Sequence, residues 1–328
     1  MDFRLSEDQE ALKQGIRSFC EGRISIDQLR ELESKPGAFD RALWGEIAEM
    51  GIFGLRLPED RGGVELNVAD AVLVFEELGR AIAPGPLIWT HLAAGLVEGA
   101  DLGDTVVGGL DMTGPSTELI MLEHLESIDT LLLLKPDGIE RIDPKAIDAT
   151  PVEIPLDPFT PVHHAKSLPA GERIADAETA KEWRLVGTAL ASAQLLGIAE
   201  STLEAATDYA KKREQFGRII GSFQAIKHIL ADCFVRQEAA RAAAYAAGAT
   251  LDYPEVGNVE RAVSAAKVVA GDAAMKNARA SIQVHGGMGY TWEVPAHYFL
   301  KRVWVLENVF GTIDEHSDQL AELVGATA

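Results

Sequence analysis

The sequence contains one long stretch whose composition strongly favours a helix. Residues 180–214, AKEWRLVGTALASAQLLGIAESTLEAATDYAKKRE, are rich in Ala, Leu and Glu and contain no proline. These three residue types have high helix propensity, whereas proline removes a backbone donor and breaks a helix. Ala-rich stretches follow at 222–251 and 258–287, and a final helix is expected near 296–310. Since alanine lets helices approach closely, the sequence predicts a C-terminal four-helix bundle over residues 179–328.

The amino-acid pattern changes between residues 101 and 178. Short apolar runs such as DTVVGGLDM and DTLLLLKP are separated by Gly, Pro and Asp, a pattern typical of strands. Seven prolines between Pro136 and Pro169 exclude a long helix there. We therefore expect a shortened β-strand domain of about six short strands at 101–178.

The first hundred residues carry helical periodicity. Ser6 is a candidate N-cap for the first helix, and a Pro/Gly turn lies at 57–63. The predicted order is a helical domain at 1–100, a β-strand domain at 101–178 and a helical bundle at 179–328. The predicted fold class is mainly α with a small β domain, an α+β protein.

The charge of the chain restricts its partners. With 328 residues and a formal net charge of −21, the chain repels nucleic acid and anionic lipid. It also repels CoA thioesters and dinucleotides, so a site for them must supply local Lys or Arg. No apolar run approaches the roughly 20 residues of a membrane span, and the start does not resemble a secretory signal. Cys20 and Cys233 form no Cys/His cluster, so we expect reduced thiols, no metal site and a cytoplasmic protein.

The stretch REQFGRIIGSFQ, residues 213–224, lies between strongly helical segments. The long helix is predicted to break at Gly217, which places Arg213 and Phe216 at a helix end. A guanidinium there can make paired hydrogen bonds to a phosphate, and an adjacent ring can pack on an adenine. Gln224 can reach a polar edge of the same ligand. The alternative is a structural corner between two helices, with Ser222 as the N-cap of the second.

The second unusual stretch is QVHGGMGYTWE, residues 283–293, which has three glycines in four positions. Glycine lets a backbone approach a ligand closely, and free N–H groups can meet phosphate or ribose oxygens. The spacing is not GxGxxG after a strand, so a Rossmann site is not indicated. The alternative is an ordinary Gly-rich loop between helices.

Four segments in order resemble the acyl-CoA dehydrogenase family of flavoenzymes. They are MDFRLSEDQEALKQGIRSF, WGEIAEMGIFGLRLPEDRGG, LLGIAESTLEAATDYAKKREQFGRIIGSFQAIKHILADC and QVHGGMGYTWEVPAHYFLKR. The resemblance implies a helical domain, a β domain, a C-terminal four-helix bundle and FAD. It also implies a reaction in which a Glu removes the α-proton of an acyl-CoA while a β-hydride passes to flavin N5.

The resemblance also implies where the cofactor binds. Carried over to this chain, one set of residues contacts the pyrophosphate and adenosine portions of FAD across a subunit interface: Arg213, Phe216, Phe223 and Gln224. A second set forms the other wall of the same half-site: Gln283, Gly286 and Gly287.

The chain departs from the family at the catalytic base. The turn that reads YEGT in many members reads VFGT here, so Phe310 stands where the Glu is expected, and the alternative base position aligns with Gly187. A phenyl ring takes no proton. Glu307 is the alternative candidate for the base, ahead of Asp314 and Glu315, which lie just past the turn.

Two further departures concern the substrate arm and the flavin ring. The family Arg that follows the helix-borne base aligns with Thr188, and Arg184 one turn earlier is expected to face solvent rather than replace it. No TEPxxGSD-like segment lies in the β region, where DMTGPSTEL at 111–119 is only a weak match.

These departures suggest a division of labour between unlike subunits. The hypothesis is a chain without its own base that pairs with a full-length acyl-CoA dehydrogenase homologue, with an α2β2 arrangement, and shares FAD across the interface. Such pairs resemble the heteromeric enzymes of actinobacterial steroid degradation, which suggests a bulky acyl-CoA substrate and an electron-transfer flavoprotein as acceptor. One alternative is a non-catalytic scaffold or binding protein. The other is a self-sufficient dehydrogenase that uses Glu307, or a hydratase- or oxidase-like variant.

Overall fold

The computed structural model describes residues 4–114 and 118–325. The chain forms two compact units, which alternate along the sequence. Unit 1 holds the described residues up to Glu21, then Val72–Ala83, and the chain from Ala189 onward. Unit 2 holds Gly22–Ala71 and Pro84–Thr188. Because these units follow contacts rather than sequence order, the predicted boundaries at 100 and 178 stay a prediction.

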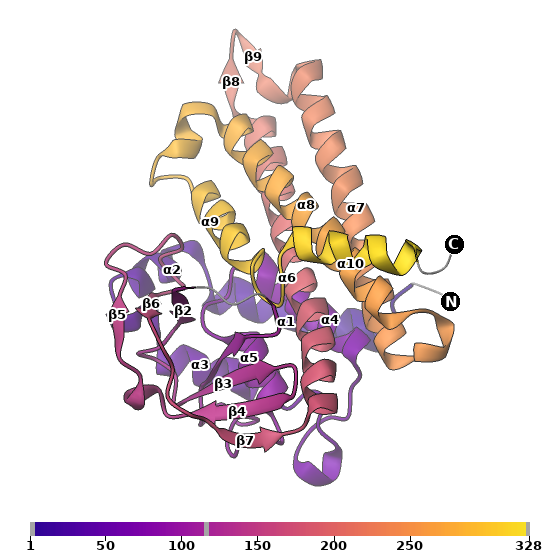
Figure 1. Ribbon diagram of the computed structural model, residues 1–328. Coiled ribbons are helices and arrows are strands. Elements are labelled where there is room, and N and C mark those ends of the chain that lie inside the picture. The colour runs from indigo at the N-terminus through magenta and orange to yellow at the C-terminus, as the bar shows by residue number, and fades with distance from the viewer. Residues whose placement is uncertain (1–3, 115–117, 326–328) are drawn as a thin grey trace. The chain divides into compact units, whose positions relative to one another are not determined.

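Unit 2 combines short helices with two small sheets (Figure 1). Its helices are α2 (Ile26–Glu33), α3 (Arg41–Glu49) and α5 (Leu87–Ala93). The four-stranded sheet has the order β1 (Val107–Asp111), β3 (Thr130–Lys135), β4 (Gly138–Ile142), β7 (Glu172–Ala175). The three-stranded sheet has the order β2 (Ile120–Glu123), β6 (Val162–Ala165), β5 (Ala149–Pro151). The predicted strand-rich segment is therefore confirmed, with seven strands where about six were expected.

The larger sheet of unit 2 is held to α5 by close packing. A Cβ on Gly109 of β1 would lie only 2.1 Å from the Trp89 ring of α5, so only glycine fits there. The Thr90 hydroxyl donates to the Val107 carbonyl at 3.1 Å and accepts from the Val107 N–H at 3.0 Å. The buried leucines of β3 follow from the uninterrupted apolar run that predicted this strand.

Unit 1 is helical. Its elements are α1 (Glu7–Arg23), α4 (Val68–Arg80), α6 (Ala177–Lys212), α7 (Gln224–Asp252), α8 (Val259–His285), α9 (Ala296–Leu306) and α10 (Ile313–Gly325), of which α1, α4 and α6 also extend into unit 2. Figure 1 shows α7 and α8 side by side, with α10 packed on α8. The Asn277 amide on α8 donates to the Ala199 carbonyl of α6 and the Cys233 carbonyl of α7. The predicted Ala-rich helices are confirmed; the last predicted helix ends at Leu306 and a further one, α10, was not foreseen.

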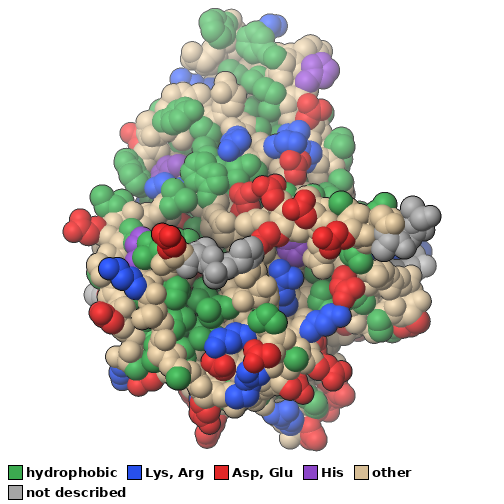
Figure 2. Space-filling model, viewed as in Figure 1, with side chains coloured by type: hydrophobic (Ala, Val, Ile, Leu, Met, Phe, Trp, Pro, Cys, Tyr) green, Lys and Arg blue, Asp and Glu red, His purple; other side chains and the backbone are tan. Residues whose placement is uncertain are grey.

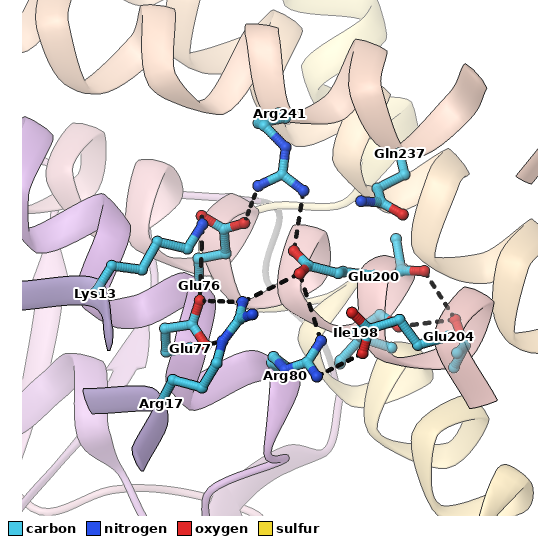
Figure 3. A network of polar contacts seen from close by, with 12 residues as sticks. Lys13, Arg17, Glu76, Glu77, Arg80, Ile198, Glu200, Glu204, Gln237 and Arg241 are labelled. Carbon is cyan, nitrogen blue, oxygen red and sulfur yellow. Dashed lines mark hydrogen bonds and ion pairs between the residues drawn. The ribbon is translucent and has the colours of Figure 1, made fainter. Parts of the chain in front are cut away.

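Charged side chains inside unit 1, together with one tyrosine, form a connected set of contacts, the buried ion network. Its members are Lys13, Arg17, Glu76, Glu77, Arg80, Glu200 and Arg241, all labelled in Figure 3, and Tyr245. Lys13 Nζ lies 2.7 Å from Glu76 Oε2, and Arg17 binds both oxygens of Glu77 at 2.8 Å. These contacts attach α1 to α4, while Arg241 of α7 contacts Glu76 and Glu200.

Candidate functional site

The long helix α6 ends at Lys212 and is followed by a short hairpin. Strands β8 (Glu214–Gln215) and β9 (Arg218–Ile219) are antiparallel and joined by Phe216 and Gly217. Both turn residues have positive φ, 54° and 75°, as a type I′ turn requires. The helix thus breaks earlier than the predicted break at Gly217. Phe216 is 91% exposed, and positive φ is unfavourable for a bulky residue.

The start of α7 differs from the structural alternative proposed for this corner. Phe223, not Ser222, is the N-cap residue, and it makes no side-chain capping bond. The Ser222 hydroxyl instead donates to the Ile219 carbonyl at 2.6 Å, so the proposed Ser222 cap is wrong. The Arg218 guanidinium lies 3.9 Å from the centre of the Phe223 ring. Gln224 is the first residue of α7 and is exposed.

The second stretch lies at the end of α8. Gly286 caps this helix with φ 61° and ψ −138°, a conformation for which glycine is suited. A Cβ placed on Gly286 or on Gly287 would meet no other atom within 4 Å, so the backbone here borders open space. Gln283, one turn earlier, is exposed.

The hairpin and the end of α8 border one cavity of about 620 Å³, the hairpin pocket. Its lining residues are Tyr209, Arg213, Gln215, Phe216, Ile220, Phe223, Ala225, Ile226, Val284, His285, Gly286, Gly287 and Met288. Five of the seven predicted cofactor residues therefore lie around one cavity, while Gln224 and Gln283 do not line it. Sequence reasoning missed Tyr209 and His285. Tyr209 lies one helical turn before Arg213, a spacing that could have identified it.

The pocket is suited to an anion. None of its lining residues is Asp or Glu. The exposed Arg213 guanidinium makes no hydrogen bond or ion pair within residues 4–114 and 118–325, so it can bind a ligand without losing an internal partner. Figure 2 shows hydrophobic side chains gathered over the hairpin end of the bundle, at the top of the view. Phe216, Tyr290 and Trp292 are among the exposed aromatic residues.

The turn after α9 carries the residue at the expected base position. Phe310 is buried, 1% exposed, with φ 57°. The fully buried Lys267 ammonium donates to the carbonyls of Leu306 at 2.9 Å and Val309 at 2.5 Å. His316 Nε2 lies 2.9 Å from the Phe310 carbonyl oxygen, to which it donates. The turn is therefore fixed by buried hydrogen bonds and presents a phenyl side chain.

The carboxylates near this turn lie at the ends of helices α9 and α10. Glu307 is the C-cap residue of α9. Glu315 accepts from the Thr312 N–H at 2.6 Å, and its own N–H donates to the Thr312 hydroxyl at 3.2 Å. This reciprocal pair is a capping box at the start of α10. Asp314 is exposed, and Gly187 is a buried position within α6 that has no side chain.

Arg184 does not face solvent as the sequence suggested. Its side chain is 28% exposed, and Nε lies 3.3 Å from Asp111 Oδ2 at the end of β1. The Thr188 hydroxyl donates to the Arg184 carbonyl at 2.7 Å. The weak match DMTGPSTEL overlaps residues 115–117, which lie outside the described residues.

The described residues were also compared with the requirements of a metal site and of a membrane-spanning helix. Within residues 4–114 and 118–325 no cluster of three His, Cys, Asp or Glu side chains is arranged to hold a metal ion. Over the same residues, none of the helices has the length and apolar character needed to cross a membrane. Cys20 and Cys233 are both buried free thiols.

Comparison with known proteins gives a consistent result over both helical parts. The acyl-CoA dehydrogenase N-terminal domain matches residues 6–99, and the acyl-CoA dehydrogenase C-terminal domain matches residues 182–325. Acyl-CoA dehydrogenase FadE34 of Mycobacterium tuberculosis is 30% identical over 91% of this chain, which spans only 45% of that relative. Acyl-CoA dehydrogenase IpdE2 of the same organism is 31% identical over 90% of this chain and 91% of its own length.

Solved structures share the fold at lower identity. The ChsE4-ChsE5 complex from Mycobacterium tuberculosis superposes with a TM-score of 0.86 at 22% identity, over 99% of both chains. The Tcur3481-Tcur3483 steroid ACAD gives a TM-score of 0.83 at 24% identity, over 98% of this chain and 99% of the other. At these identities the likeness concerns the fold.

Proposed function

The chain belongs to the acyl-CoA dehydrogenase family, and from this premise we propose that it is one subunit of a heteromeric, FAD-dependent acyl-CoA dehydrogenase. In this role it donates the hairpin pocket to the adenosine and pyrophosphate portion of an FAD that it shares with a catalytic partner subunit. One observation carries the proposal. Arg213, three aromatic rings and two open glycines surround a cavity without a carboxylate in its lining.

The residues present fit such a cofactor. The cavity of about 620 Å³ is within the usual range of ligand sites, roughly 300–1,000 Å³. Gly286 and Gly287 leave open the space that a Cβ would fill. Arg213 supplies a positive charge in a chain whose net charge is −21. A dinucleotide half with two phosphates and a flat base matches this combination of cation and aromatic surface.

Each side chain then has a defined task. Arg213 binds pyrophosphate oxygens, with the fork of its guanidinium suited to paired hydrogen bonds. Phe216 and Phe223 provide flat surfaces for the adenine, and the 286–287 backbone lets the ribose approach. Gln224 and Gln283 complete the rim where the partner subunit closes the site. Bound FAD would supply the hydride acceptor of the reaction.

The proton-transfer step is assigned to the partner subunit. Phe310 occupies the base position with a buried phenyl ring, and Gly187 offers no side chain at the alternative position. Glu315 is engaged in a helix cap. Glu307 keeps the lesser role that the sequence gave it, a substitute base in a self-sufficient enzyme. We therefore propose that this chain binds cofactor and the partner, a full-length homologue, removes the α-proton.

Two structural neighbours support a proposal for the substrate and the assembly. The Tcur3481-Tcur3483 neighbour is a steroid ACAD, and the ChsE4-ChsE5 neighbour is a complex. We propose a bulky, ring-containing acyl-CoA as substrate, an α2β2 assembly and an electron-transfer flavoprotein as acceptor. The location proposed for this assembly is the cytoplasm.

The proposal is tested by measuring bound flavin. The chain is purified alone and after co-expression with a full-length acyl-CoA dehydrogenase encoded beside it, and visible flavin absorbance gives the FAD content. We expect one FAD per heterodimer and none in the chain alone. A colourless complex would favour the scaffold alternative. A yellow chain that desaturates acyl-CoA alone would favour the self-sufficient enzyme and make Glu307→Gln the next variant.

A substitution in the pocket and a matched control test whether FAD binds in the hairpin pocket. Gly287→Leu projects a side chain into open space, so it should block the cavity without disturbing the fold. Gly22→Leu on α1 also meets no atom within 4 Å, and it lies outside the pocket lining. We expect at least a tenfold loss of FAD affinity in the first variant and no change in the second. Equal FAD content in both would place the cofactor elsewhere.

A further inference from the structure

His285 is a pocket residue whose chemistry the proposed function does not use. It is the last residue of α8, it is 7% exposed, and it lines the hairpin pocket. Its ring lies 4.3 Å from the Tyr209 ring, centre to centre, with the planes inclined by 34°. Nδ1 lies 2.7 Å from the Ser281 carbonyl oxygen, one turn back. Two contacts therefore fix both the position and the orientation of the imidazole.

The Ser281 contact also fixes the tautomer. A carbonyl oxygen only accepts hydrogen bonds, so the proton of the neutral ring is on Nδ1. In that tautomer Nε2 carries a lone pair and is an acceptor. Nε2 makes no hydrogen bond to any of residues 4–114 and 118–325, so within this part of the chain its lone pair is available to a ligand.

The surroundings of His285 favour a ligand group that donates a hydrogen bond. The carbonyl end of α8 is the negative end of its macrodipole, which suits donor groups rather than phosphate. The lining contains one cation, Arg213, which comes from the hairpin side of the cavity. The amide of Gln215, another lining residue, already donates to the Glu214 carbonyl at 2.7 Å. The pocket thus offers an acceptor at α8 and a cation at the hairpin.

We propose that His285 determines the base specificity of the pocket, with Nε2 accepting a hydrogen bond from the exocyclic amino group of adenine. The inference rests on the proposed function, because it assumes that a nucleotide occupies this cavity. Deamination of adenine to hypoxanthine replaces that donor by a carbonyl acceptor, which would face the Nε2 lone pair. The pocket should therefore bind adenine nucleotides about tenfold more tightly than their hypoxanthine counterparts.

The test uses two nucleotides without a flavin. ADP and IDP are titrated by calorimetry into the complex with the partner subunit after its FAD has been removed, and the ratio of their dissociation constants is the readout. His285→Phe keeps a ring against Tyr209 but removes the acceptor. We expect wild type to prefer ADP about tenfold and this variant to lose the preference by weakening ADP alone. His285→Gln, which restores an acceptor oxygen, should regain part of the preference, and His228→Phe on the exposed face of α7 serves as the control.

The outcomes separate this inference from the proposed function. Equal binding of ADP and IDP to wild type, or an unchanged ratio in His285→Phe, overturns the role of His285 and leaves the nucleotide pocket in place. A parallel weakening of both nucleotides in His285→Phe assigns the ring a packing role and also overturns the inference. Binding of neither nucleotide to wild type overturns the pocket assignment itself.

Discussion

The buried ion network and the hairpin pocket lie in the same helical unit, but within the described residues charged side chains are paired in the network and left unpaired in the pocket. In the network, Glu76 is 0% exposed and accepts from Lys13 and Tyr245, both at 2.7 Å, as well as from Arg241. In the pocket, the exposed Arg213 guanidinium has no hydrogen-bond or ion-pair partner within residues 4–114 and 118–325. The first region satisfies its charges internally, and the second keeps one available.

This difference indicates which region is structural and which is functional. A buried charge that loses its partner is strongly destabilising, so a substitution at a buried member of the network should lower stability. An exposed cation and an exposed ring held at positive φ add little to stability, and strained residues concentrate at binding sites. We expect substitutions in the network to change the free energy of unfolding and substitutions in the pocket to change cofactor affinity.

The largest effect is expected for Glu76→Gln. The amide removes the negative charge that Lys13, Tyr245 and Arg241 share, and leaves two cations underpaired in a buried setting. The free energy of unfolding should fall by about 3–5 kcal/mol, measured by urea denaturation of the full chain. Asp27→Asn is the matched control, because that carboxylate is 89% exposed in its pair with Arg30 and should matter by less than about 0.5 kcal/mol. Similar losses in both variants would contradict a special role for the network.

The second prediction concerns acid stability through Glu200. Burial acts to raise the pKa of this carboxyl, but the positive charges of Arg241, Lys13 and Arg17 outweigh burial and lower it to about 2. A carboxyl whose folded pKa is depressed stabilises the protein above its ordinary pKa of 4.5, and this contribution is lost as pH falls toward 2. Between about pH 4.5 and pH 2, the free energy of unfolding of the wild type should therefore fall by about 3 kcal/mol more than that of Glu200→Gln. Parallel pH profiles of unfolding for the two proteins would rule this out.

The sequence could predict the elements but not these contacts. The helix α6 follows from local propensity alone, because its Ala, Leu and Glu residues favour a helix whatever surrounds them. The bond between Glu76 and Arg241 joins residues 165 positions apart, and no local pattern encodes it. The same holds for Arg184, which the sequence placed in solvent and which pairs with Asp111, 73 positions away.

The sequence predicted only part of the pocket, because some of its contacts also join residues that are far apart in the chain. Arg213 and the glycines at 286–287 were identified because their residue types and the family resemblance suggest a phosphate site. The pairing of Tyr209 with His285 brings two different helices together and was not visible in either stretch alone. The hairpin was missed because a phenylalanine at positive φ contradicts the usual turn preference for Asn or Gly.

The third prediction tests the pocket side of the comparison. Arg213→Ala should weaken FAD binding in the complex about 10- to 100-fold, the effect of losing charge-assisted hydrogen bonds worth about 1.5–3 kcal/mol. Because the Arg213 guanidinium has no partner in the described chain, the free energy of unfolding should change by less than about 0.5 kcal/mol. Fluorescence of released flavin measures the first quantity and urea denaturation the second.

Lys211→Ala provides the control for that prediction. Lys211 is 70% exposed, lies in the last turn of α6 two residues before Arg213, and does not line the pocket. It removes the same unit of charge from the same end of α6. Equal losses of FAD affinity in the two variants would mean that Arg213 contributes only to the general electrostatic field.

The smallest effect, and the one that separates the two regions most sharply, is expected for Phe216→Gly. Glycine adopts φ 54° without the cost that a side chain imposes there, and the 91% exposed ring gives up little buried area. The chain should therefore become more stable by about 1 kcal/mol while its FAD affinity falls. Phe216→Ala keeps the Cβ and hence the strain, so it should lose affinity without gaining stability. If Phe216→Gly instead destabilised the chain, the ring would be supporting the hairpin, and the pocket would resemble the network in depending on its internal contacts.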